Sequence, residues 1–191
     1  PIDVHDLGMD MLSASAHKFN GPKGVGFLYI RSGLKVMPYS DGGAQEFGLR
    51  AGTENVAGIV GMAVALKNNC DALEENVRYV EGLESKLVSM LENSGIKYVR
   101  NGGKSGLPGL ISLSFPDADG EAILHRLDLT GICISTGSAC NSKNTEISHV
   151  LQAIRLEDNY AKGTVRISLG KSNTEEDVEV LFKALMKIFR A

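Results

Sequence analysis

Short apolar runs alternate with amphipathic segments along the whole chain. Residues 9–16 and 24–31 each predict a strand, because both are short and the second is rich in β-branched and aromatic side chains. An apolar, alanine-rich helix is predicted over 56–68, with Thr53 expected as its N-cap. A longer helix is predicted over 71–93, since apolar residues recur there at steps of three and four.

The second half of the chain predicts a compact α/β layer in which strands and helices alternate. Strands are expected at 96–99, 110–115, 131–135 and 164–170, with a glycine-rich loop over 101–109. Helices are expected from Asp117 or Asp119 to Leu129, over 148–154, and after a capping box formed by Thr174 and Asp177. The apolar face of the last helix comprises Val178, Leu181, Phe182, Leu185, Ile188 and Phe189.

Composition narrows the function classes. A chain of 191 residues with 43% hydrophobic content can bury a real core. The 20 basic and 23 acidic residues are mixed without runs of like charge, which disfavours direct binding of nucleic acid. No apolar segment approaches the length of a membrane span, and the first residues do not have the pattern of a signal peptide. We therefore expect a cytoplasmic protein without a membrane role.

The three cysteines fit thiols in a reducing compartment. Cys70, Cys133 and Cys140 are odd in number and form no CxxC pair, which favours neither a disulfide framework nor zinc. Cys133 lies in the apolar run "GICIS" and is expected to be a small core residue. Cys140 lies in the polar stretch "STGSACNSKNTEISH" and is expected to be exposed. This pattern leaves two interpretations of Cys140 open, an ordinary loop thiol or a nucleophile.

The segment "SASAHKFNGPKGVG" gathers chemical groups where a predicted strand ends. Open α/β sheets commonly bind ligands at this position. The hydroxyl of Ser15 and the imidazole of His17 can both donate hydrogen bonds to a phosphate, and the amine of Lys18 can attack a carbonyl. This combination indicates pyridoxal phosphate.

Two further features of this segment bear on that interpretation. Glycines at 21, 24 and 26 would let the backbone pass close to a bulky cofactor. The alternative is that Lys18 and Lys23 are solvated loop lysines and that His17 is a surface side chain.

Arg166 lies inside the apolar strand "TVRISLG", where its charge needs a partner. A substrate carboxylate bound by the guanidinium group is one such partner. An internal aspartate is the other, and the sequence pattern does not choose between the two.

Four segments, "SASAHKFNGPKGVGFLYIR", "GGAQEFGLRAGTENVAGIVG", "STGSAC" followed by "SHVLQAI", and "VRISLG", together resemble a known family. In order and spacing they are similar to the C-terminal half of the NifS/IscS cysteine desulfurases, which are pyridoxal-phosphate-dependent enzymes of aminotransferase class V and fold type I. The resemblance covers nearly the whole chain. It implies an α/β fold in which 1–70 is a remnant of the large cofactor-binding domain, 71–94 a connecting helix and 95–191 a small C-terminal α/β domain.

The resemblance also implies a set of cofactor-binding residues. Lys18 would form the internal aldimine with pyridoxal 5'-phosphate, and Ser15 and His17 would bind its phosphate. Thr53 would reach the phosphate of the neighbouring subunit's cofactor, which implies a homodimer.

The substrate implied by the resemblance is L-cysteine. Arg166 would hold its carboxylate, and Cys140 would take its sulfur as a persulfide and release L-alanine. The sulfur would then pass to an acceptor protein, such as an iron–sulfur scaffold.

In this family a cofactor-stacking histidine and the aspartate that pairs with the pyridine nitrogen precede the "PIDV" segment, so we expect this chain to be a fragment with little turnover by itself.

The resemblance leaves two other functions open. The parent enzyme could instead be a selenocysteine lyase or another fold-type I lyase. The chain could also be a non-catalytic module that binds a sulfur acceptor through the loop around Cys140 and its last helix.

Overall fold

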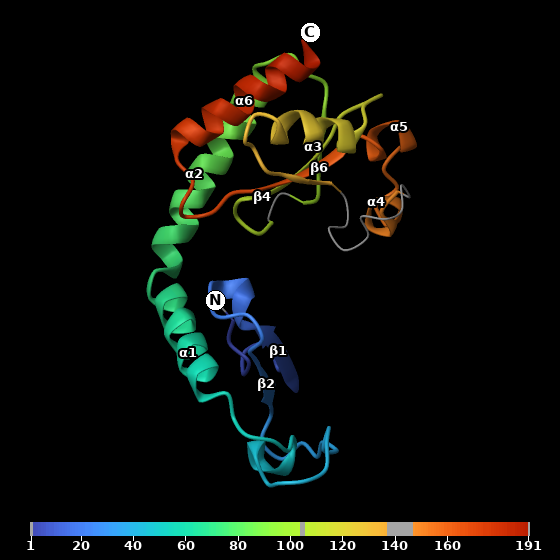
Figure 1. The fold of residues 1–191 in the computed structure, drawn as a ribbon. Coiled ribbons are helices and arrows are strands. Elements are labelled where there is room, and N and C mark those ends of the chain that lie inside the picture. The colour runs from blue at the N-terminus through green and yellow to red at the C-terminus, as the bar shows by residue number, and fades with distance from the viewer. Residues whose placement is uncertain (1, 104–105, 137–146, 191) are drawn as a thin grey trace. The chain divides into compact units, whose positions relative to one another are not determined.

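The computed structural model describes residues 2–103, 106–136 and 147–190. They fall in two compact units, one of residues 1–73 and one of residues 74–191, and each is considered by itself. Figure 1 shows the elements of both. Cys140 lies outside the described residues, so its expected exposure stays a prediction.

The first unit is built on a β-hairpin. Strand β1 (Met11–Ser15) pairs antiparallel with β2 (Gly26–Ile30), and Ser15 lies opposite Gly26 at the end of the ladder. Both strands were expected from the sequence and are confirmed. Two 3-10 turns and one helix complete the unit, namely η1 (Ala16–Phe19), η2 (Glu46–Gly48) and α1 (Val56–Asp71).

Helix α1 begins with a different cap from the one that the sequence predicts. The side chain of Asn55 accepts a hydrogen bond from the backbone N–H of Gly58 at 3.1 Å, whereas Thr53 lies two residues earlier and is exposed. Thr53 as the cap is therefore wrong, because an N-cap must immediately precede the first helical residue to reach these N–H groups.

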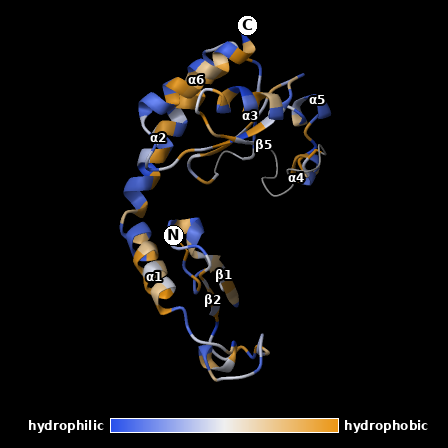
Figure 2. Cartoon of the chain, viewed as in Figure 1, coloured by the Kyte–Doolittle hydropathy of each residue, from blue (hydrophilic) through white to orange (hydrophobic). Residues whose placement is uncertain are grey.

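The predicted apolar character of α1 is visible in Figure 2, where much of the helix has hydrophobic colours. Val56, Val60 and Val64 are 66%, 57% and 54% exposed, so this surface makes few contacts within its own unit. In the described ranges no helix has both the length and the apolarity that a membrane span requires.

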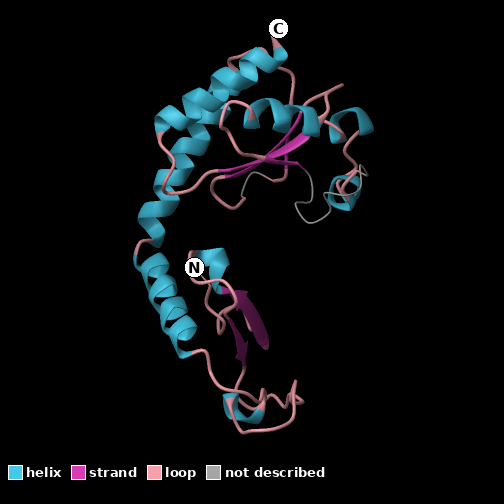
Figure 3. Ribbon diagram, in the orientation of Figure 1, coloured by secondary structure: helices cyan, strands magenta, loops and turns pink. Residues whose placement is uncertain are grey.

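The second unit is a four-stranded antiparallel sheet with helices (Figure 3). The strands run in the spatial order β3-β4-β6-β5, and every neighbouring pair is antiparallel. The elements are α2 (Leu73–Glu92), β3 (Val99–Asn101), β4 (Leu110–Ser114), α3 (Gly120–Asp128), β5 (Ser135–Thr136), α4 (His149–Ala153), α5 (Asp158–Ala161), β6 (Thr164–Ser168) and α6 (Glu175–Phe189).

One face of this sheet and three helices form the core. Helices α2, α3 and α6 lie over the sheet in Figure 1 and contribute leucine, isoleucine and valine side chains to a single apolar cluster. The apolar face expected for the last helix is confirmed. The cluster comprises Leu83, Leu87, Leu91, Ile111, Leu113, Phe115, Ile123, Leu127, Val165, Ile167, Val178, Leu181 and Leu185.

Two predicted strands differ from those observed. The strand expected at 96–99 lies at Val99–Asn101, because the Ser94 hydroxyl donates to the Leu91 carbonyl and accepts from the Ile96 N–H, which keeps the chain in a turn. The strand expected at 131–135 shrinks to Ser135–Thr136. Gly131, with φ of 80°, is part of the C-terminal turn of α3, and short α5 was not expected at all.

Cys133 is exposed, so its prediction as a core residue is wrong. Ile132 and Ile134 pack against the apolar cluster on either side of it. Side chains alternate between the two faces of an extended segment, so the residue between these isoleucines points away from the core.

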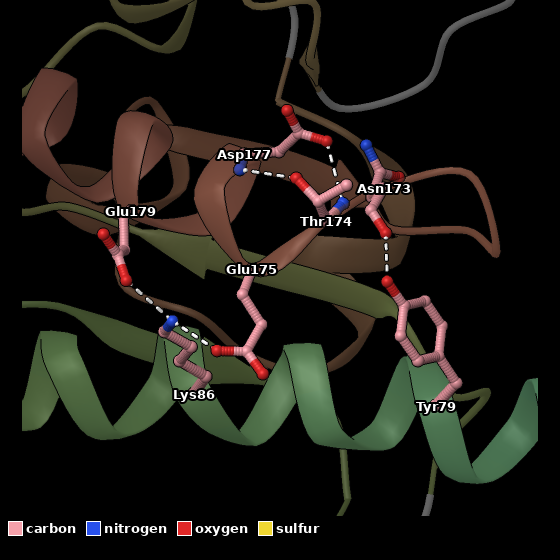
Figure 4. A network of polar contacts seen from close by, with 7 residues as sticks. All are labelled: Tyr79, Lys86, Asn173, Thr174, Glu175, Asp177 and Glu179. Atoms are coloured by element: carbon pink, nitrogen blue, oxygen red, sulfur yellow. Dashed lines mark hydrogen bonds and ion pairs between the residues drawn. The ribbon is translucent and has the colours of Figure 1, made fainter.

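The start of α6 carries the predicted capping box (Figure 4). Thr174 Oγ1 accepts from the backbone N–H of Asp177 at 3.2 Å, and Asp177 Oδ2 accepts from the backbone N–H of Thr174 at 2.9 Å. The N-cap of α3 is Asp119, one of the two candidates that the sequence offered.

Polar contacts also join α2 to the start of α6. Lys86 Nζ donates to Glu175 and to Glu179, each at 2.8 Å, and the Tyr79 hydroxyl donates to the carbonyl of Asn173 at 2.6 Å (Figure 4). The two carboxylates raise the pKa of Lys86, and the ammonium group lowers the pKa of Glu179. These contacts lie at the rim of the apolar cluster and fix the register between the two helices.

The capping box predicts an acid-sensitive contribution to stability. The hydrogen bond from the Thr174 backbone lowers the pKa of Asp177 below its usual 3.8, so this contribution is present above that pH and is lost as the pH falls through the lower folded-state pKa. We expect Asp177→Asn to flatten the fall in unfolding free energy between about pH 5 and about pH 2, measured by urea titration. Glu176→Gln is the control, because Glu176 makes no hydrogen bond or ion pair with any described residue. An unchanged slope in Asp177→Asn would contradict the prediction.

Candidate functional site

The residues predicted to bind the cofactor lie together in a tight turn at the end of β1. Ser15 is the last residue of the strand, and His17 and Lys18 lie in the 3-10 turn that follows. All three are exposed, and their side chains form no hydrogen bond with the described residues. Asn20, in the left-handed conformation with φ of 64°, then redirects the chain.

The backbone of this turn is held from several sides. Ala16 is fully buried, and its N–H donates to the carbonyl of Val25 at 3.0 Å. The N–H of Gly21 closes the turn onto the Ala16 carbonyl at 2.8 Å. From α1, the Asn69 side chain donates to the carbonyl of Phe19 at 2.7 Å. The turn therefore keeps a defined shape while its polar side chains point outward.

Two of the three glycines in this segment have a reason other than room for a cofactor. A Cβ on Gly26 would collide with the carbonyl oxygen of Ala14, and a Cβ on Gly21 would lie 2.9 Å from the Cβ of Ala16. Both glycines thus allow the close packing of the turn against its own strand. Gly24 meets no neighbour but has φ of 77°, which favours glycine.

Thr53 lies in the loop between η2 and α1 and is exposed. The loop is shaped by Arg50, which donates to the carbonyl of Gly52 at 2.8 Å and pairs with Glu46 at 3.1 Å. In the same loop region the side chain of Phe47 is 99% exposed. Its backbone has φ of 58°, a left-handed conformation that residues other than glycine rarely adopt. The role of Thr53 at a neighbouring subunit's cofactor stays a prediction.

In the second unit, Arg166 belongs to a row of polar residues across the sheet. Asn101 pairs in register with Ser112, Ser112 with Arg166, and Arg166 with Ser135. Partners in an antiparallel register share one face, so this row lies on the face opposite the apolar cluster. Sequence reasoning found Arg166 but missed the other three residues. Only Ser112 had a local signal, the polar residue at every second position of "LISLS".

The surroundings of Arg166 leave part of its guanidinium group without a partner. Nη2 lies 3.3 Å from the Ser135 hydroxyl, and the buried Nε has no hydrogen-bond partner in the described ranges. Within these ranges no carboxylate forms an ion pair with Arg166, so the alternative of an internal aspartate finds no support there. Arg166, Ser112 and Asn101 line a cavity of about 430 Å³, together with the start of α4 and the loop after β3.

The structure thus brings Ser15, His17 and Lys18 together in one unit and surrounds Arg166 with polar partners in the other. A cleft shared by Lys18 and Arg166 stays a prediction. Among the described residues, no cluster of three or more histidine, cysteine, aspartate or glutamate side chains could hold a metal ion.

Comparison with known proteins decides the family. The model of the aminotransferase class-V family matches residues 1–181. The chain belongs to this family. It is 44% identical over 189 residues to the cysteine desulfurase IscS of Dictyoglomus turgidum, an alignment that covers 98% of this chain and 48% of that protein. This class V chain spans about half the length of the curated relatives that it matches.

Solved structures agree with this assignment. A NifS-like protein matches with a TM-score of 0.87 and 42% identity, covering 100% of this chain and 49% of that chain. The structure of SspA in complex with cysteine matches with a TM-score of 0.66 and 34% identity, covering 91% of this chain and 47% of that chain. The resemblance to NifS/IscS desulfurases and the α/β fold class of fold-type I enzymes are confirmed.

The packing of Gly26 predicts how the turn of this class V chain can be disrupted. Gly26→Ala should push β2 away from Ala14 and lower the unfolding free energy by about 1–3 kcal/mol, measured by urea titration. It should also shift the amide NMR signals of η1. Ser13→Ala, an exposed position on the paired strand, is the control and should do neither. Equal effects of the two variants would show that Gly26 is not needed for its size.

Proposed function

We propose that the protein is a cysteine desulfurase, which converts L-cysteine to L-alanine and keeps the sulfur as a persulfide on Cys140. Arg166 is the observation that carries the proposal, because its guanidinium group lines a cavity and has a buried donor with no partner in the described ranges. An α-carboxylate supplies the charge and the acceptor oxygens that this arginine needs. The relative solved in complex with cysteine supports a substrate of this class.

The turn after β1 fits pyridoxal 5'-phosphate. A hydroxyl, an imidazole and a primary amine are exposed within four residues and make no hydrogen bonds to the described residues. Ser15 and His17 would hold the phosphate, and Lys18 would bind the aldehyde carbon. When bound, this cofactor supplies an electron sink next to the substrate's α-carbon. Thr53 would contact the phosphate of the cofactor in the neighbouring subunit, which makes the protein a homodimer.

The chemistry on sulfur falls to Cys140. Its thiolate attacks the sulfur of cysteine, a sulfur–sulfur bond forms, and the bond between sulfur and the substrate's β-carbon breaks. The electron pair of that bond stays with the carbon, which takes up a proton and leaves as alanine. Arg166 keeps the amino acid in place by its carboxylate during this step. The persulfide then passes to a sulfur-acceptor protein such as an iron–sulfur scaffold, in the cytoplasm.

The assignment of Lys18 predicts where the cofactor attaches. Added pyridoxal phosphate, fixed by borohydride reduction and mapped by peptide mass spectrometry, should label Lys18, because Ser15 and His17 hold the phosphate beside it. Lys18→Ala should lose this label. Lys23→Ala should keep it, since Lys23 is an exposed lysine of the same loop without these neighbours. A label on Lys23 or on other lysines would contradict the assignment.

The assignment of Cys140 predicts a separation between cofactor binding and sulfur transfer. In the complete natural protein, Cys140→Ser should lower the rate of alanine formation from cysteine by about 100-fold or more, because the nucleophile is removed. Borohydride labelling of Lys18 should be unchanged. Cys70→Ser, at the end of α1, is the control and should keep full activity. Unchanged alanine formation in Cys140→Ser, or release from selenocysteine without release from cysteine, would refute a desulfurase.

A further inference from the structure

Hydrogen bonds on the polar face of the second sheet connect Thr164, Ser114 and Asn101. Thr164 Oγ1 donates its proton to the carbonyl of Tyr160 at 3.3 Å. The hydroxyls of Thr164 and Ser114 lie 2.7 Å apart, and each has a single proton. Either hydroxyl of this pair can be the donor. On its other side Ser114 Oγ accepts from the Nδ2 of Asn101 at 2.7 Å.

The Asn101 amide donates to both serines through Nδ2, and its buried Oδ1 has no partner in the described ranges. The second proton of Asn101 Nδ2 goes to Ser112 Oγ at 3.1 Å, so Ser112 is an acceptor in this contact. Its own hydroxyl proton reaches no acceptor among the described residues. Ser114 is fully buried, whereas Ser112 is half-buried and lines the cavity. Ser112 therefore has one donor left to offer a ligand.

Ser112 lies opposite Arg166 on the neighbouring strand. Ser112 and Arg166 are register partners on neighbouring strands, which brings their Cβ atoms to about 4.5–5.5 Å from one another. Both line the same cavity, and the buried Nε of Arg166 has no partner in the described ranges. A neutral O–H and a guanidinium N–H side by side suit a group with two acceptor oxygens and a negative charge.

We propose that Ser112 is a second ligand of the amino-acid carboxylate at Arg166 and that Asn101 is the positioning residue that turns the Ser112 hydroxyl toward it. The proposal rests on the proposed function, which assigns the carboxylate to Arg166. Asn101 acts through Ser112, because its Nδ2 donates to Ser112 and so leaves the Ser112 proton for the carboxylate. Ser114 and Thr164 anchor this chain of hydrogen bonds on the Tyr160 carbonyl.

The experiment titrates the full chain with L-alanine and follows the Nε–H signal of Arg166 by NMR. L-Alaninamide, which has no carboxylate, is the matched probe and should leave this signal in place. We expect Ser112→Ala to weaken L-alanine binding by about tenfold, the usual effect of losing one hydrogen bond to a charged group. Asn101→Ala should weaken it by about threefold, because the Ser112 hydroxyl remains but is free to rotate.

Three variants separate this role from a structural one. Ser112→Thr keeps the hydroxyl and should bind L-alanine within about twofold of the unaltered chain. Ser168→Ala removes an exposed hydroxyl from the strand that carries Arg166, at a position that does not line the cavity, so it should leave the affinity nearly unchanged. Ser112→Cys keeps the shape of the side chain but replaces the hydroxyl with a thiol, which is a weak hydrogen-bond donor. It takes the place of Ser112→Ala if that variant fails to fold.

The outcomes distinguish this proposal from the one on which it rests. Unaltered affinity in Ser112→Ala and Ser112→Cys, with binding lost in Arg166→Lys, overturns the role of Ser112 and leaves the carboxylate site at Arg166 intact. Unaltered affinity in Asn101→Ala overturns the positioning role alone. An Arg166 signal that does not respond to L-alanine, or responds equally to L-alaninamide, overturns the carboxylate site and the proposed function with it.

Discussion

The two-residue alternation of the antiparallel sheet is the constraint on which the second unit depends. It sends Ile111 and Leu113 of β4 into the apolar cluster and leaves Ser112 between them on the other face. The same alternation on β6 buries Val165 and places Arg166 in register with Ser112. A slip of one residue would exchange the two faces and move a guanidinium group into the core, so burial of the apolar side holds the polar row in place.

The first unit positions its site residues by other means. Among its described residues only Ala16 and Gly58 are buried, so a large apolar core does not hold the turn after β1. Backbone hydrogen bonds at Ala16 and Gly21, the Asn69 side chain and the tight fit of Gly26 do so instead. The cost of this arrangement is an apolar helix surface that stays exposed within the unit.

The two units divide the proposed chemistry between them. The turn after β1 presents groups that suit a phosphate and an aldehyde, and the polar row around Arg166 presents groups that suit a carboxylate. The proposed function needs both, because it requires a bound pyridoxal phosphate and a bound amino-acid carboxylate. The roles proposed for Ser112 and Asn101 belong to the carboxylate part of this division.

The sequence by itself determined most elements, because helix faces, the Thr174–Asp177 capping box and the turn after β1 depend on residues close along the chain. It also singled out Lys18 and Arg166 by their unusual settings. Tertiary structure alone decided that Asn101, Ser112, Arg166 and Ser135 form one row, and that Cys133 faces outward. Register between strands and the choice of the buried face depend on contacts between residues far apart in the sequence, which no local pattern records.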